Sequence, residues 1–144
     1  EVRKAQSEKK RTEDESKKCL RILLAEDNEL NREIATFILK DEGMKVTEAV
    51  DGKQAVSLFT NKPENYYDAI LMDVMMPVMD GYQATKAIRS SGRKDAKTIP
   101  IIAMTANAFD EDRRKSNEAG MNAHLSKPLE TKKLLEEIVR LCEK

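Results

Sequence analysis

The strongest constraint on the fold is a regular alternation of short apolar blocks with segments of helical periodicity. Apolar blocks typical of buried strands lie at Leu20–Ala25, Ala69–Met72 and Ile99–Met104. Less apolar blocks at Lys45–Val50 and Asn122–Ser126 predict two further strands. Strands that alternate with helices predict parallel βαβ units, and right-handed crossovers then cover both faces of the sheet. We therefore expect an α/β fold with a single doubly wound, five-stranded parallel sheet and five helices.

Each of the five helices follows one strand, and four of them have apolar residues at helical spacing. The helical period is marked by Leu30, Ile34, Phe37 and Ile38 in the first helix, by Ala55, Leu58 and Phe59 on one face of the second, by the inward residues Tyr82, Thr85 and Ile88 of the third, and by Leu134, Leu135, Ile138 and Leu141 in the last. The fourth helix, about Phe109 to Ala119, has few apolar residues. Little core contact holds it, so it is the element expected to shift most easily.

Length and charge exclude several classes of protein. The 144 residues suit one domain, which we place at 19–144 after a charged linker or tail at 1–18. Because Lys+Arg and Asp+Glu both total 26, no net field favours nucleic acid or anionic lipid. No apolar run is long enough to span a membrane, so we expect no membrane contact by this segment. The chain begins at Glu1 rather than Met, and we expect it to be a piece of a longer protein.

The cysteine and histidine content is low. Cys19 and Cys142 are the only cysteines, and they show no spacing typical of a disulfide scaffold or metal cluster. A reducing, cytoplasmic compartment is therefore the simplest interpretation. The single His124 excludes a polyhistidine metal site.

Polar residues stand where the predicted strands end. Glu26 and Asp27 follow the first strand, Asp73 ends the third, Thr105 follows the fourth, and Lys127 follows the fifth. Ligands of doubly wound sheets bind outside these carboxyl ends. Taken singly, each residue could be a helix-dipole partner, a turn former, a cap or a surface charge. Their joint occurrence at the ends of one sheet favours a functional site.

The residue types at this edge indicate phosphoryl chemistry. Crowded carboxylates repel, and a bound cation relieves that repulsion. Oxygen ligands without His or Cys favour Mg²⁺, or a similar ion such as Mn²⁺. Lys127 is a compact cation suited to a phosphoryl oxygen, and Asp73 is placed as a carboxylate nucleophile. Phosphoryl transfer needs mainly positioning and charge neutralisation, which these groups can supply.

Four segments carry a specific resemblance to a known family: ILLAEDNELNREIA, AILMDVMMPVMDG, IPIIAMTANA and HLSKPL. They resemble the receiver domain of two-component response regulators, of the type found in hybrid sensor histidine kinases. The resemblance covers about residues 19–144. It implies a flavodoxin-like receiver fold with strand order 2-1-3-4-5.

The resemblance also implies a role for each acidic residue. Asp73 would accept a phosphoryl group from a phosphohistidine and later lose it by slow self-dephosphorylation. Asp27 and Asp73 would ligate Mg²⁺ directly, together with the backbone carbonyl of Met75. Glu26 would ligate the ion through water.

The remaining motif residues are implied to couple phosphorylation to a conformational switch. Thr105 would be the switch hydroxyl, and Lys127 would bind the phosphoryl group before a cis peptide at Pro128. His124 stands three residues before the lysine, where the family usually has a switch aromatic. In this family Asn107 and Met75 flank the path of the hydrolytic water.

The implied partner is a histidine kinase or a histidine phosphotransfer domain. We expect it to dock on the first helix, through Asn28, Leu30, Asn31 and Ile34. The segment would belong to, or be partnered with, a hybrid kinase that can itself be attached to a membrane. The resemblance also allows a homodimer through the last helices.

Three alternatives are weaker. An aspartate-nucleophile phosphatase commonly needs a second Asp two residues after the nucleophile, and Met75 stands there. A nucleotide-binding fold lacks its GxGxxG or GxxxxGK[ST] signature. A soft-metal site at Met72, Met75, Met76 and Met79 is conceivable, but core filling is the usual role of Met.

Overall fold

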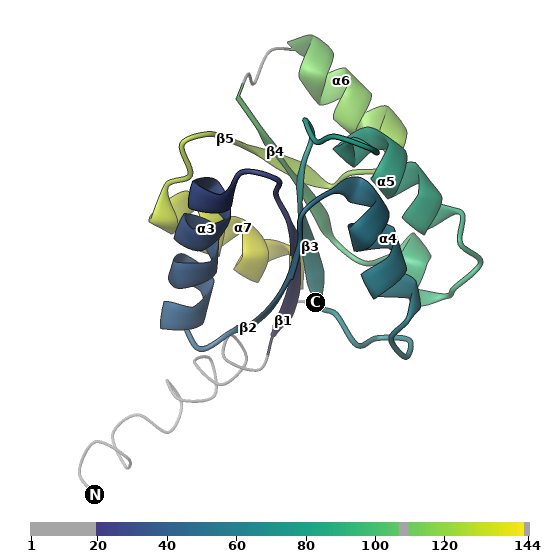
Figure 1. Cartoon of the computed structure of the whole chain (residues 1–144), viewed down its shortest axis with the longest axis horizontal. Helices are drawn as coiled ribbons and strands as arrows, with labels where there is room; N and C mark the ends of the chain where they lie inside the picture. The colour runs from purple at the N-terminus through teal and green to yellow at the C-terminus, as the bar shows by residue number, and fades with distance from the viewer. Residues whose placement is uncertain (1–19, 107–109, 143–144) are drawn as a thin grey trace, which may run out of the picture.

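The computed structural model describes residues 20–106 and 110–142, in which five strands alternate with five α-helices (Figure 1). The elements are β1 (Arg21–Ala25), α3 (Glu29–Asp41), β2 (Lys45–Ala49), α4 (Gly52–Thr60), β3 (Ala69–Asp73), α5 (Gly81–Arg89), the short 3-10 helix η1 (Asp95–Lys97), β4 (Ile101–Thr105), α6 (Asp110–Ala119), β5 (Ala123–Ser126) and α7 (Thr131–Cys142). The predictions for the segment 1–18, for Cys19 and for Asn107 lie outside the described residues.

All strand pairs are parallel, and the strand order is β2-β1-β3-β4-β5. The predicted α/β class, strand order and number of elements are confirmed. Helices α3 and α7 cover one face of the sheet, while α4, α5 and α6 cover the other (Figure 1). No helix in residues 20–106 and 110–142 has both the length and the apolar character needed to cross a membrane.

Strands β3 and β4 are buried along their whole length, as their continuous apolar runs predicted. Alternate residues of β3 enter different cores. Ile70 and Met72 pack in the core beneath α4 and α5, whereas Ala69 and Leu71 pack in the core beneath α3 and α7. The sheet is therefore fixed from both sides, which holds the carboxyl ends of its strands in place.

Local sequence signals place the helix ends close to those strand ends. Asn28, Asp51 and Asp80 cap the starts of α3, α4 and α5, and each side chain accepts a backbone N–H from the first turn. Gly43 follows α3 with a φ of 87°, in the left-handed region that glycine adopts without strain. Because Asn28 begins α3 directly after Asp27, the acidic pair is confined to a very short loop.

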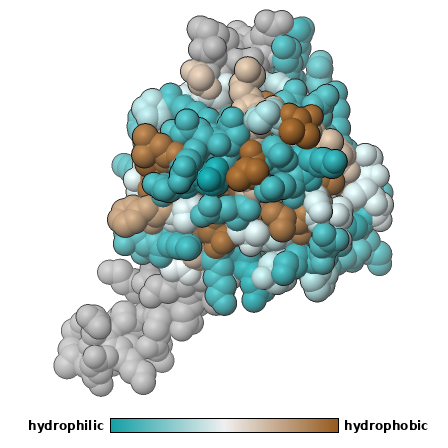
Figure 2. All heavy atoms as spheres, in the orientation of Figure 1, coloured by the Kyte–Doolittle hydropathy of each residue, from teal (hydrophilic) through white to brown (hydrophobic). Residues whose placement is uncertain are grey.

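The apolar residues that mark the period of the first helix divide between the surface and the core. Leu30, Ile34 and Phe37 are 65%, 45% and 71% exposed, and of these four apolar residues only Ile38 is buried. The buried face of α3 instead consists of Ala35, Thr36, Ile38 and Leu39. The small Ala35 packs in the core between α3 and the sheet, while the larger apolar stripe faces solvent. Figure 2 shows that hydrophobic side chains reach the surface as separate patches among hydrophilic ones.

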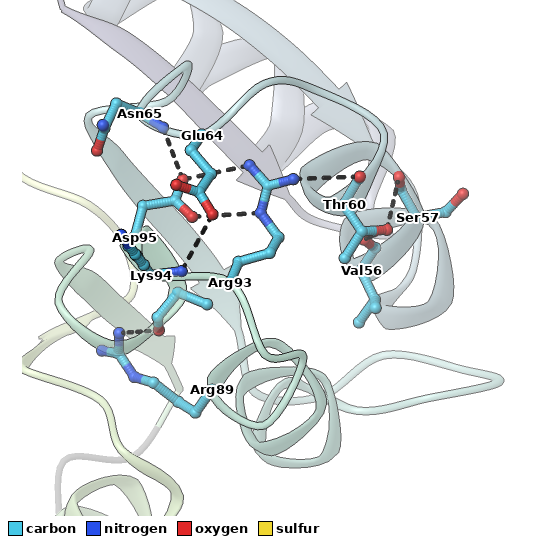
Figure 3. Close-up of polar contacts among 10 residues, drawn as sticks. Val56, Ser57, Thr60, Glu64, Asn65, Arg89, Arg93, Lys94 and Asp95 are labelled. Carbon is cyan, nitrogen blue, oxygen red and sulfur yellow. Dashed lines mark hydrogen bonds and ion pairs between the residues drawn. The ribbon is translucent and has the colours of Figure 1, made fainter.

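A polar network ties the loops together at the amino-terminal edge of the sheet, away from the predicted site (Figure 3). The Arg93 guanidinium donates to the Asp95 carboxylate at 3.2 Å and to the Thr60 carbonyl at 3.3 Å. Asp95 also accepts the backbone N–H of Asn65 at 2.8 Å. Burial raises the pKa of Asp95, but the N–H of Asn65 and the Arg93 guanidinium outweigh burial and hold that pKa below its usual range.

Candidate functional site at the carboxyl edge of the sheet

The structure brings the predicted site residues together at one edge. Glu26 follows β1 and Asp73 ends β3, and both are 2% exposed, whereas Asp27 is exposed. Oxygen atoms of these three carboxylates all lie within 4.8 Å of one another. Thr105 is buried at the end of β4. The oxygen-only donor set suits a hard divalent cation, as expected from the residue types.

Lys127 links the two buried carboxylates. Its Nζ lies 2.9 Å from Glu26 Oε1 and 3.0 Å from Asp73 Oδ2. Its backbone N–H donates to the Thr105 carbonyl at 2.8 Å, which continues the pairing of β4 with β5. The Lys127–Pro128 peptide bond is cis. One ammonium therefore contacts carboxylates from two different strands, which neutralises part of their charge.

Burial and charge shift the acid–base properties of this cluster. Burial raises the pKa of Asp73 to about 7; Lys127 opposes this rise, and the neighbouring charge of Glu26 adds to it. Burial alone would lower the pKa of Lys127, but contacts with Glu26 and Asp73 outweigh it and raise that pKa. The cluster thus contains more negative charge than one ammonium balances, and it is suited to gain a cation.

Two glycines fix the loop that follows Asp73. A Cβ at Gly81 would lie 2.3 Å from the Asp73 carbonyl oxygen, and a Cβ at Gly52 would lie 2.3 Å from the Met79 carbonyl oxygen. Gly81 also donates its N–H to the Val74 carbonyl at 3.1 Å. The sequence alone did not single out Gly81. Its role in positioning Asp73 becomes visible only when α5 folds back against the end of β3.

The methionines do not gather into a ligand cage. Met72 is fully buried in the core, whereas the side chain of Met75 is exposed. Met76 and Met79 pack partly against the same core as Met72. The backbone N–H of Met75 donates to Asp73 Oδ1 at 3.3 Å. The arrangement gives no support to a soft-metal site and places the Met75 backbone beside the candidate metal ligands.

His124 has a partner that the sequence did not suggest. It is half-buried in β5, and its Nε2 accepts a hydrogen bond from Arg113 Nε of α6 at 2.9 Å. Nε2 can accept this bond only through its lone pair. His124 and Arg113 also line one cavity of about 310 Å³ together with Lys127.

The expected docking residues surround the same edge. Asn28 Oδ1 accepts the N–H of Asn31 at 2.9 Å, so this asparagine caps α3. Asn31 and Ile34 line a cavity of about 160 Å³ with Glu26 and Lys127. An exposed apolar stripe, formed by Leu30, Ile34 and Phe37, thus begins beside the buried carboxylates.

Comparison with known proteins agrees with this geometry. The model of the response regulator receiver domain matches residues 22–139. The chain belongs to this receiver family. It is similar to hybrid signal transduction histidine kinase I of Dictyostelium discoideum, with 38% identity over 85% of the chain. The receiver spans only 7% of that kinase's length.

Two solved structures show the same fold. The receiver domain of sensor histidine kinase PA1611 from Pseudomonas aeruginosa is 41% identical, with a TM-score of 0.78 over 87% of this chain and 98% of that one, and it holds a magnesium ion in its active-site cleft. The receiver domain of Saccharomyces cerevisiae Ssk1, crystallised with the phosphotransfer protein Ypd1, is 28% identical with a TM-score of 0.76. That match covers 85% of this chain and 88% of the other. The comparisons thus agree with a receiver domain, and the phosphatase alternative is not favoured.

We predict that Asp73→Asn stabilises the metal-free receiver at high pH. Because the folded-state pKa of Asp73, about 7, lies above that of the unfolded chain, the stability linked to its proton is complete below about pH 4 and is lost as pH rises through about 7. At pH 8 the variant should gain roughly 1–4 kcal/mol of unfolding free energy, at about 1.4 kcal/mol per pKa unit.

Denaturant unfolding at pH 8 and pH 5 in chelator measures this effect. The gain should be largest at pH 8 and should shrink at pH 5. Asp27→Asn is the matched control, because its exposed carboxylate is screened by water and its loss should change stability little. Equal stability of Asp73→Asn and wild type at pH 8 would contradict the raised pKa of Asp73 and the burial of charge that causes it.

Proposed function

We propose that Asp73 is the phosphoacceptor of this receiver and that the phosphoryl donor is a phosphohistidine. The observation that carries this proposal is the buried carboxylate of Asp73, which lies 3.0 Å from the Lys127 ammonium and within 4.8 Å of two further carboxylates. Asp27, Asp73, the Met75 carbonyl and, through water, Glu26 would hold Mg²⁺ or Mn²⁺. When bound, the ion would neutralise charge on the phosphoryl oxygens.

The transfer exchanges one bond for another. A carboxylate oxygen of Asp73 attacks the phosphorus, a P–O bond forms, and the P–N bond to the donor imidazole breaks. The electron pair of that bond returns to the imidazole nitrogen. Lys127 stabilises the charge on the transferred group because its ammonium already stands beside the acceptor oxygen. One of its two carboxylate contacts would be replaced by a phosphoryl oxygen.

Phosphorylation would then move the β4–α6 side of the domain. The new group carries roughly −1.5 to −2 charges, by analogy with other phosphorylated side chains. The Thr105 hydroxyl at the end of β4 would turn to donate to a phosphoryl oxygen. His124 would turn inward behind it and leave its hydrogen bond to Arg113 of α6. Helix α6 buries only Ser116 and Ala119 among its described side chains, which suits a mobile element.

The chain would act as the receiver part of a hybrid histidine kinase on the cytoplasmic side, with 1–18 as its linker. Its partner would be a histidine kinase or a phosphotransfer domain, docked on Asn28, Leu30, Asn31 and Ile34. The exposed apolar stripe of α3 supports this surface, as does the Ssk1–Ypd1 complex of a related receiver. A homodimer through the last helices stays a prediction.

Intact mass spectrometry tests the proposed function. Incubation with Mg²⁺ and a small acyl phosphate should add one phosphoryl group to the wild type and none to Asp73→Asn. Chelation of the metal should abolish the gain. Modification of Asp73→Asn to the wild-type extent would refute the assignment.

We predict that the α3 surface selects the protein donor. Leu30→Ala should slow transfer from a phosphohistidine domain about tenfold, which corresponds to ~1.4 kcal/mol and suits the loss of one apolar contact. Asn31→Ala should also slow it. Both variants should react normally with the acyl phosphate, because that donor makes no contact with α3. Equal losses with both donors would indicate damage to the site rather than lost docking.

A further inference from the structure

A guanidinium outside the predicted site holds the loop that carries the two acidic metal-ligand candidates. Arg32, in the first turns of α3, donates from its NH1 group to the Glu26 carbonyl at 2.9 Å and to the Asp27 carbonyl at 3.4 Å. Its side chain is largely covered, with 15% exposed. The hydrogen bonds go to the backbone, so they fix the direction of the peptide that carries both carboxylates.

Arg32 is itself fixed by the neighbouring strand. Its Nε donates to Glu48 Oε1 of β2 at 3.1 Å, and the Thr36 hydroxyl donates to Glu48 Oε2 at the same distance. Both oxygens of Glu48 are therefore engaged by α3. A planar guanidinium with one edge on a carboxylate and the other on carbonyls has little rotational freedom. The pair forms a brace between β2, α3 and the loop after β1.

The same loop is held at its other end by the sheet. The Glu26 N–H donates to the Ala49 carbonyl of β2 at 3.0 Å, and the Asn28 N–H donates to Glu26 Oε2 at 3.1 Å. Asp27 lies between these anchors and is exposed. Among the described residues, Arg32 is the only one whose side chain donates a hydrogen bond to the Asp27 carbonyl. The orientation of Asp27 thus depends on Arg32 more than that of Glu26 does.

We propose that Arg32, braced by Glu48, is a positioning residue that sets the affinity of the site for its divalent cation. This inference rests on the proposed function, because it takes Asp27 as a metal ligand. A fixed carboxylate binds a cation without the entropic cost of being ordered first. Partners that orient metal ligands typically change metal affinity by about 10- to 100-fold when removed.

The direction of the change in Mg²⁺ affinity distinguishes a positioning role of Arg32 from a purely electrostatic one. Arg32→Gln removes a positive charge near an acidic cluster and leaves Glu48 without its ion-pair partner. On electrostatic grounds alone this variant should therefore bind Mg²⁺ more tightly. Loss of positioning predicts the opposite result, a weakening of about tenfold, at the lower end of the usual range. The double variant Arg32→Gln/Glu48→Gln leaves the net charge unchanged and should still bind weakly.

Mg²⁺ titration of the full chain, followed by amide chemical shifts, provides the test. Arg32→Lys keeps the charge without the planar fork and should restore affinity only in part. Arg89→Gln is the matched control, because Arg89 donates to the carbonyls of Ala96, Ile99 and Gly120 at the opposite edge. It should lower stability and leave Mg²⁺ affinity unchanged.

The outcomes are distinct. A roughly tenfold loss in Arg32→Gln and in the double variant, with normal affinity in Arg89→Gln, supports the inference. Unchanged or tighter binding by Arg32→Gln overturns it and leaves the proposed function intact. A wild-type chain that binds no Mg²⁺ overturns the proposed metal site and this inference together.

Discussion

The contact of one ammonium with two buried carboxylates is the interaction on which the rest of the site depends. Lys127 follows β5, yet its Nζ lies within 3.0 Å of carboxylate oxygens that follow β1 and end β3. Such contacts form only if these three strand ends lie at one edge of the sheet, as the parallel pairing of the strands requires. The two-layered core that holds the strands in register is thus also what assembles the site.

The site and the opposite edge of the sheet play different energetic roles. Burial of charge is costly, and the raised pKa of Asp73 shows that its ionised form is disfavoured in the metal-free fold. At the amino-terminal edge, by contrast, Asp95 is fully engaged by Asn65 and Arg93, and its pKa is lowered (Figure 3). The amino-terminal edge therefore stabilises the fold, whereas the carboxyl edge retains excess negative charge that a bound cation can neutralise.

The sequence predicted the fold class and the convergence of the site because both follow from periodicity and from the ends of strands. It left open whether the apolar stripe of α3 faces the core or a partner. Leu30, Ile34 and Phe37 have the spacing of a core-facing stripe, and periodicity alone cannot distinguish a face buried in the domain from one exposed to a partner. The contacts of long charged side chains could not be predicted either. Arg32 and Arg113 make specific contacts that depend on tertiary structure, and a charged residue on a helix has no local signal for its partner.

Of the three carboxylates clustered at the strand ends, Asp73 is the one proposed to receive the phosphoryl group. Borohydride reduction of the phosphorylated chain converts an acyl phosphate into an alcohol, and peptide mass spectrometry then locates the modified residue. The account predicts reduction at Asp73 alone, with Glu26 and Asp27 unchanged. Reduction at Glu26 or Asp27, or at no carboxylate of this cluster, would contradict it.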